Sequence, residues 1–182
     1  LIISSILITI LSAGIAIGAP PIAMCFLPTK SSIRIQSFTW SILRLIPPPL
    51  YVLLLMLCTK PCVSVAALAL GLNSFGVMGR LLKEKIDIQD KSIQKSVKST
   101  GAGLRTAWIY GSLTPNSRSY LAYAAYRADV ILRETVIVGA VGGIGLGWQL
   151  RESLSSFAWG EVFVVTTTYV CISLIAERIA DR

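Results

Sequence analysis

Long stretches without charge alternate with charged segments along this chain. Residues 1–29 and 61–79 contain no Asp, Glu, Lys or Arg, and residues 153–176 contain only Glu161. About 20 mainly apolar residues cross a bilayer as a helix, so each of these stretches is long enough to be a span. Proline and glycine interrupt the first stretch, and the pair Pro20-Pro21 predicts a kink or an end in its helix.

Two further apolar regions are less regular. Residues 45–59 are uncharged but short, so the predicted span includes residues 37–44, with Arg44 reaching toward the interface. Three consecutive prolines, 47–49, predict an irregular start. Residues 119–150 are mostly apolar but contain four charged side chains. The pattern therefore predicts an all-α polytopic transmembrane bundle with about five visible spans.

Residues 80–118 have a different character, with eight Lys or Arg against three Asp or Glu. Apolar residues 86, 93, 97, 104 and 108 recur at helical spacings, and Gly101 and Gly103 interrupt the run. We interpret this segment as two short amphipathic helices joined at a glycine turn outside the membrane. A helix pair lying on the membrane surface is the alternative.

Composition excludes several classes of function. Hydrophobic residues make up 54% of the chain and charged residues 14%, whereas soluble domains carry about 25% charged residues. The chain contains no histidine, which excludes histidine-based catalysis and metal ligation by histidine. The net charge is +8, but the cations do not form the basic stripe that is typical of a nucleic-acid-binding domain. We expect no cofactor and no metal. The four cysteines (Cys25, Cys58, Cys62 and Cys171) form no CxxC pair and are expected to be free thiols, with a Cys58–Cys62 disulfide as the alternative.

The distribution of cations predicts the orientation. Residues 30–44, residues 80–118 and the C-terminus together hold thirteen of the seventeen Lys and Arg. The positive-inside rule places these segments in the cytoplasm. Leu1 then starts on the outer side, and we expect an additional span upstream of it.

Several motifs carry a resemblance to a known family. They are Arg44-Leu-Ile-Pro47, Gly79-Arg-Leu-Leu-Lys83-Glu84, Ser99-Thr-Gly-Ala-Gly103, Tyr110-Gly-Ser-Leu113, Tyr120-Leu-Ala-Tyr123, Tyr126-Arg127-Ala-Asp129, and Thr135-Val-Ile-Val-Gly139-Ala-Val-Gly142-Gly-Ile-Gly145. Together they resemble the phosphonate-type permeases of ABC importers, within the wider methionine-permease-like fold. The resemblance implies one permease domain over residues 1–182, a multi-pass protein of the bacterial inner membrane.

The resemblance also implies a cytoplasmic coupling segment, residues 83–115, that docks on an ATPase subunit. The family pattern has a Glu-Ala dipeptide, a glycine and a later Leu-Pro; here Lys95-Ser96 replace Glu-Ala, and Thr114 stands in the proline position. The residues expected to form the coupling loop are Val97, Gly101, Ala102, Gly103, Trp108, Leu113 and Pro115. A short amphipathic helix is expected to bury Val97 and Trp108 against the partner.

Charged and glycine residues inside the spans are the other candidate sites. Arg127, Asp129 and Arg133 are substrate-pathway candidates, because ionisable groups inside a membrane should face protein or water. Asp129 and Arg133 are four residues apart and are expected to pair. An internal salt-bridge network that fixes helix packing is the alternative role. Glycines 139, 142, 143 and 145 (Gly139, Gly142, Gly143 and Gly145) form either part of a gate or a close helix contact.

The implied function is passage of a small oxyanion, such as phosphonate, phosphite or phosphate, with ATP hydrolysis on a separate subunit. The implied partners are the ATPase, a periplasmic substrate-binding protein, a second permease copy and membrane lipid. The chain itself is expected not to be an enzyme. Alternatives are a permease for another solute such as methionine, a non-transporting membrane scaffold, and a membrane enzyme acting on lipids, which would need clustered acidic or histidine side chains.

Overall fold

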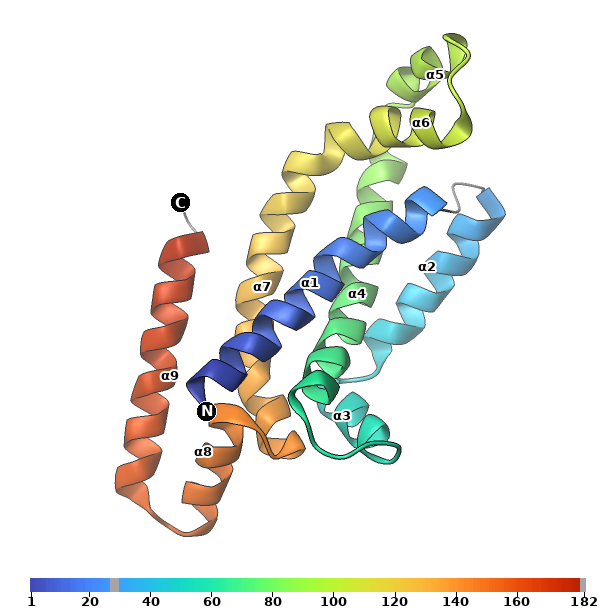
Figure 1. Ribbon diagram of the computed structural model, residues 1–182. Coiled ribbons are helices and arrows are strands. Elements are labelled where there is room, and N and C mark those ends of the chain that lie inside the picture. Colours follow the sequence, from blue (N-terminus) through green and yellow to red (C-terminus); the bar gives the residue numbers. More distant parts are fainter. Residues whose placement is uncertain (27–29, 181–182) are drawn as a thin grey trace.

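The computed structural model describes residues 1–26 and 30–180, and every regular element in these ranges is a helix (Figure 1). The elements are α1 (Ile2–Phe26), α2 (Lys30–Leu45), α3 (Pro48–Met56), α4 (Val63–Ile88), α5 (Ser92–Ser99), α6 (Leu104–Trp108), the π-helix η1 (Ile109–Leu113), α7 (Thr114–Gly142), α8 (Gly145–Ser155) and α9 (Trp159–Ala180). The predicted all-α class is confirmed.

The number of candidate spans agrees with the sequence pattern. Helices α1, α4 and α9 are each long and apolar enough to cross a membrane. Two bent pairs also pass this test together: α2 with α3 at an angle of 90°, and Leu104–Gly142 with Gly145–Ser155 at 56°. Counting each pair as one span gives five. The start of α2, the end of α4, α5, α6 and the end of α9 lie at the same end of the bundle, as the predicted orientation requires (Figure 1).

Helix α1 continues through Pro20 and Pro21 to Phe26, so the predicted end of the helix at these prolines is wrong. A proline has no backbone N–H and leaves the carbonyl four residues earlier without its helical partner. For Pro21 this is the carbonyl of Ile17, and the Tyr120 hydroxyl of α7 donates a hydrogen bond to it at 2.7 Å. The neighbouring helix thus satisfies the group that the proline leaves free.

The charged segment also differs from its prediction. Helix α4 runs on to Ile88, so Ile86 belongs to a long membrane helix and shares no helix with residues 93–108. Ion pairs four residues apart, Arg80–Glu84 at 2.8 Å and Lys83–Asp87 at 3.9 Å, support this extension, which contains no proline. The two short helices joined at a glycine turn exist, but they are α5 and α6.

Helix α4 is the centre of the bundle, with α1, α2 and α7 around it. One buried cluster includes Ile8, Val52, Leu70, Ile131 and Val138; a second includes Met24, Trp40, Met78, Leu82 and Trp108. Glycine permits the close contact of α2 with α4, because a Cβ at position 79 would lie 2.6 Å from the Trp40 ring. No residue of the apolar window of α9 is buried, although α9 contacts α7 and α8 and the Tyr169 hydroxyl donates to the Leu132 carbonyl of α7 at 3.4 Å.

Candidate functional site

The coupling segment lies at one end of the bundle, where α5 and α6 project beyond the long helices (Figure 1). Asp90 lies two residues before α5: its Oδ1 accepts the Ser92 backbone N–H at 3.0 Å and its Oδ2 accepts the Ser92 hydroxyl at 2.7 Å. The Ser92 hydroxyl first, and then the backbone N–H, hold the pKa of Asp90 below its usual value. Gly101 has φ +80°, a left-handed conformation that turns the chain toward α6.

Hydrogen bonds to α4 fix the position of this segment. The Gln89 side chain, just beyond α4, donates to the Gly111 carbonyl of η1 at 3.1 Å and accepts from the Asn116 amide at 2.6 Å. Asn116 also donates to the Ser112 carbonyl at 2.8 Å. Sequence reasoning did not identify Gln89 or Asn116, because isolated amides in a charged stretch resemble ordinary solvated residues.

The predicted coupling residues divide into two groups. Gly101, Ala102 and Gly103 form the turn, Val97 is half-buried on α5, and Pro115 lies in the first turn of α7. Trp108 is only 3% exposed and packs in the cluster with Met24 and Trp40, with half-buried Leu113 beside them. Trp108 therefore cannot be buried against a partner as predicted, because the chain's own helices already cover it. The apolar side chains exposed at this end include Ile88 at the end of α4, Ile93 on α5 and Leu104 on α6.

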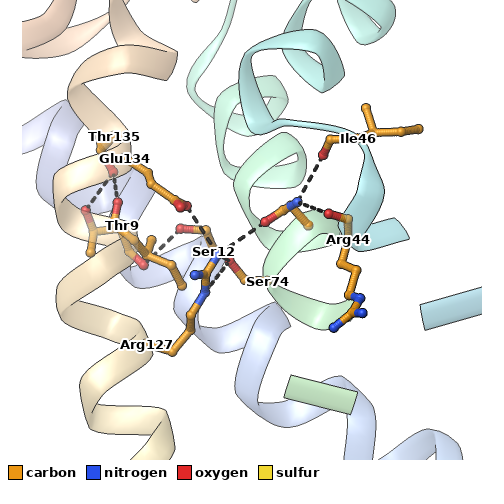
Figure 2. A network of polar contacts seen from close by, with 10 residues as sticks. Thr9, Ser12, Arg44, Ile46, Ser74, Arg127, Glu134 and Thr135 are labelled. Atoms are coloured by element: carbon orange, nitrogen blue, oxygen red, sulfur yellow. Dashed lines mark hydrogen bonds and ion pairs between the residues drawn. The ribbon is translucent and has the colours of Figure 1, made fainter. Parts of the chain in front are cut away.

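Arg127 is the centre of a buried polar network between α4 and α7 (Figure 2). Its guanidinium donates to the Ser74 hydroxyl at 3.0 and 3.2 Å, to the Asn73 amide oxygen at 3.2 Å and to Glu134 at 3.3 Å. The Arg127 side chain is 13% exposed and that of Glu134 is 27% exposed. Of the two roles considered for Arg127, this geometry fits the packing network.

The same network reaches the bend between α2 and α3. The Asn73 amide donates to the Ile46 carbonyl at 3.0 Å and to the Arg44 carbonyl at 3.5 Å (Figure 2). Arg44 lies in the last turn of α2 and Ile46 just beyond it. The Arg44 carbonyl lacks its helical partner because Pro48 has no N–H, and the Leu50 N–H donates to the Pro47 carbonyl and leaves the Ile46 carbonyl free for Asn73. Asn73 therefore joins the α2–α3 bend to α4, and through Arg127 to α7.

Asp129 and Arg133 pair at 2.7 Å, as their spacing predicts. The Arg133 side chain is 56% exposed, whereas that of Asp129 is 15% exposed. The second carboxylate oxygen of Asp129 is buried and has no hydrogen-bond partner. Of the three charged candidates, Arg133 is the one that presents a largely open positive charge on the surface of α7.

The glycine-rich segment forms the connection between α7 and α8. Gly143 and Gly145 have φ of +71° and +70°, so both make the left-handed turn. A Cβ on Gly139 would strike the Ile144 carbonyl, and one on Gly142 would lie 3.3 Å from Val52. Gly147, the fifth glycine of this segment, packs against the Val136 carbonyl so closely that no Cβ fits. Close helix packing accounts for these contacts without a gate.

No protein-family model matches the chain. It is 32% identical over 156 residues to a putative phosphite transport system permease protein, HtxE, of Stutzerimonas stutzeri, across 85% of this chain and 59% of HtxE. It is 29% identical over 132 residues to the phosphate-import permease protein PhnE of Mycolicibacterium smegmatis, across 72% of this chain and 24% of PhnE. The chain thus spans less than two thirds of the length of these two relatives.

A further relative is matched over nearly its whole length, and a solved structure shares the fold. The putative cryptic phosphonate transport system permease protein PhnE2 of Escherichia coli is 25% identical across 63% of this chain and 94% of PhnE2. A crystal structure of an amino acid ABC transporter with histidines superposes with a TM-score of 0.76 at 18% identity, across 99% of this chain and 89% of that one. The chain is therefore a multi-pass inner-membrane protein, a homologue of the phosphite, phosphonate and phosphate transport permeases, with the fold of an ABC transporter membrane subunit.

Proposed function

We propose that this chain is the membrane-spanning permease subunit of an ABC importer that carries a small oxyanion, such as phosphonate, phosphite or phosphate, into the cell. The observation that carries this proposal is the 32% identity to a phosphite permease along 85% of the chain. The permease supplies the path and changes between inward- and outward-open states, while ATP hydrolysis on another subunit drives the change. On this proposal the chain itself is not an enzyme.

The proposed ATPase contact is the open end of the coupling segment, residues 83–115. Exposed Ile93 and Leu104 and half-buried Val97 are the apolar contacts there, and Lys91, Lys95 and Lys98 supply positive charge around them. Gly101 allows the close turn that brings α5 and α6 together. A periplasmic binding protein and a second permease copy complete the proposed assembly.

Within the proposed pathway, Arg133 attracts the oxyanion and Arg127 holds helices together. Arg133 is largely exposed, whereas every described contact of Arg127 is with α4 or α7. Replacing Arg133 with Gln should therefore lower oxyanion uptake with normal assembly, while replacing Arg127 should first reduce the amount of folded protein. Unchanged uptake in an assembled double variant would remove both arginines from the pathway.

Co-expression with ATPase and binding-protein genes from the same genome tests the whole proposal. Co-purification of the ATPase, together with ATP-dependent uptake of phosphite, phosphonate or phosphate into proteoliposomes, is the expected result. A chain that binds no ATPase would instead be the scaffold, which Lys95-Ser96 in the Glu-Ala position favours. Uptake of methionine but of none of the three oxyanions would refute the substrate class.

A further inference from the structure

A polar pocket opens between α2 and α4 at the end of the bundle that carries the coupling segment. Its volume is about 310 Å³, the lower end of the range of about 300–1,000 Å³ for small-molecule sites. Its lining residues are Ser37, Phe38, Ser41, Arg80, Lys83 and Glu84. Lys83 and Glu84 begin the coupling segment, residues 83–115, but none of the six is among the predicted coupling-loop residues, the Arg127 network or the pathway candidates.

The surroundings of this pocket are apolar and exposed. Along α2, the side chains of Ile35, Phe38, Ile42 and Leu45 form an exposed stripe at helical spacing. In a membrane protein such a stripe faces acyl chains. Phe38 belongs both to this stripe and to the pocket, so the pocket opens toward lipid at the level of the cationic end of the bundle.

The charged groups in the pocket leave both donors and an acceptor free for a ligand. The Arg80 Nε donates to Glu84 Oε1 at 2.8 Å and its Nη1 donates to the Ser41 hydroxyl at 3.1 Å. In the described part of the chain, Arg80 Nη2 and Glu84 Oε2 have no hydrogen-bond partner. Lys83 lies 3.9 Å from Asp87, too far for a hydrogen bond, so its ammonium is also available. Two cationic donors and one carboxylate oxygen therefore face the same space.

From this arrangement we infer that the pocket is a binding site for the headgroup of phosphatidylethanolamine. Basic pockets between helices on the cytoplasmic side of a membrane bind phospholipid headgroups. Arg80 and Lys83 hold the phosphodiester, and Glu84 accepts a hydrogen bond from the primary ammonium. Phosphatidylcholine has a cation without an N–H donor, and phosphatidylglycerol has only neutral hydroxyl donors, so neither gives the Glu84 carboxylate a hydrogen bond from a cation.

The test is native mass spectrometry of the purified, delipidated full chain, with one lipid added at a time. The lipids are phosphatidylethanolamine, phosphatidylcholine and phosphatidylglycerol with identical acyl chains. The expected result is retention of phosphatidylethanolamine with about tenfold higher affinity than either competitor, the factor that one charge-assisted hydrogen bond supplies. Equal retention of the three lipids, or preferred retention of phosphatidylglycerol, overturns the proposal.

Two variants separate the roles of the charges. Glu84→Gln should lose the preference for phosphatidylethanolamine, and Lys83→Gln should weaken retention of all three lipids. Glu177→Gln and Arg34→Gln are matched controls, because both residues are exposed and lie outside the pocket, and they should leave retention unchanged. If the Glu84→Gln variant still prefers phosphatidylethanolamine, the Glu84 carboxylate does not bind the ammonium group and the assignment is refuted.

Two measurements on the unaltered chain keep the proposal testable if a variant does not fold. A phosphatidylethanolamine with a photoactivatable headgroup should cross-link to peptides within residues 33–45 or 80–87, and cross-links confined to other helices refute the site. Millimolar inorganic phosphate should not displace the lipid. Displacement by phosphate would identify a site for free anions and would overturn the lipid assignment.

Discussion

Replacing Arg127 with Met should cost this protein about 2–3 kcal/mol of unfolding free energy. The change leaves Glu134, the Ser74 hydroxyl and the Asn73 amide oxygen without their common donor. Removing one partner of a buried ion pair costs about 3–5 kcal/mol. We lower that figure because the Glu134 side chain is 27% exposed and can be protonated when it loses its partner.

Three further variants provide stability losses with which that of Arg127→Met can be compared. Arg133→Met also leaves a half-buried carboxylate, Asp129, without its partner, but it removes one ion pair where Arg127→Met removes four hydrogen bonds. Water can reach the place of the Arg133 side chain, which is 56% exposed, so the expected loss is smaller, about 1–2 kcal/mol. Glu134→Gln keeps an acceptor for Arg127 and should cost less than Arg127→Met. The double variant Arg127→Met, Glu134→Met should be more stable than Arg127→Met alone, because it leaves no unpaired charge.

Reversible unfolding in mixed detergent micelles, followed by circular dichroism, measures these differences. Uptake in proteoliposomes is measured on the same preparations. If Arg127→Met proves as stable as Arg133→Met while uptake is lost, the packing role is wrong and Arg127 belongs to the pathway. If both stability and uptake are unchanged, the Arg127 hydrogen bonds in Figure 2 contribute nothing measurable.

Three other outcomes are expected. Gly147→Ala should destabilise the fold by about 1–3 kcal/mol, because no Cβ fits there, whereas Gly18→Ala, with open space around it, should be neutral in the same unfolding assay. Tyr120→Phe leaves a proline-freed carbonyl of α1 unsatisfied and should cost about 1–3 kcal/mol; a smaller loss would mean that water replaces the hydroxyl. The Ser64 hydroxyl, first among several hydrogen bonds, lowers the pKa of the exposed Cys62 thiol, so more thiolate is present at neutral pH. The pH midpoint of maleimide labelling should therefore rise in Ser64→Ala, and a fall would contradict this.

The sequence was most informative where a single physical rule dominates. Uncharged runs of adequate length predicted the spans, and the pairing of Asp129 with Arg133 followed from spacing alone. It was least informative where the partner comes from a distant part of the chain. The contacts of Arg127 with residues 73 and 74 and of Tyr120 with residue 17 depend on how helices assemble. The partner of Trp108 was predicted wrongly for the same reason. The spacing of apolar residues shows which face of a helix is apolar but not whether the chain itself or another subunit covers that face.

The π-helix η1 adds one residue to the turn that joins α6 to α7. A widened turn of this kind is what a single-residue insertion into an α-helix leaves behind. Removing one residue between 109 and 113 would therefore restore ordinary helix and rotate α5 and α6 by about 100° around the axis of α7. Gln89 would then no longer meet the carbonyl of Gly111, and the apolar side chains of the projecting helices would point in a different direction. The direction in which α5 and α6 project from the bundle thus depends on the number of residues in η1.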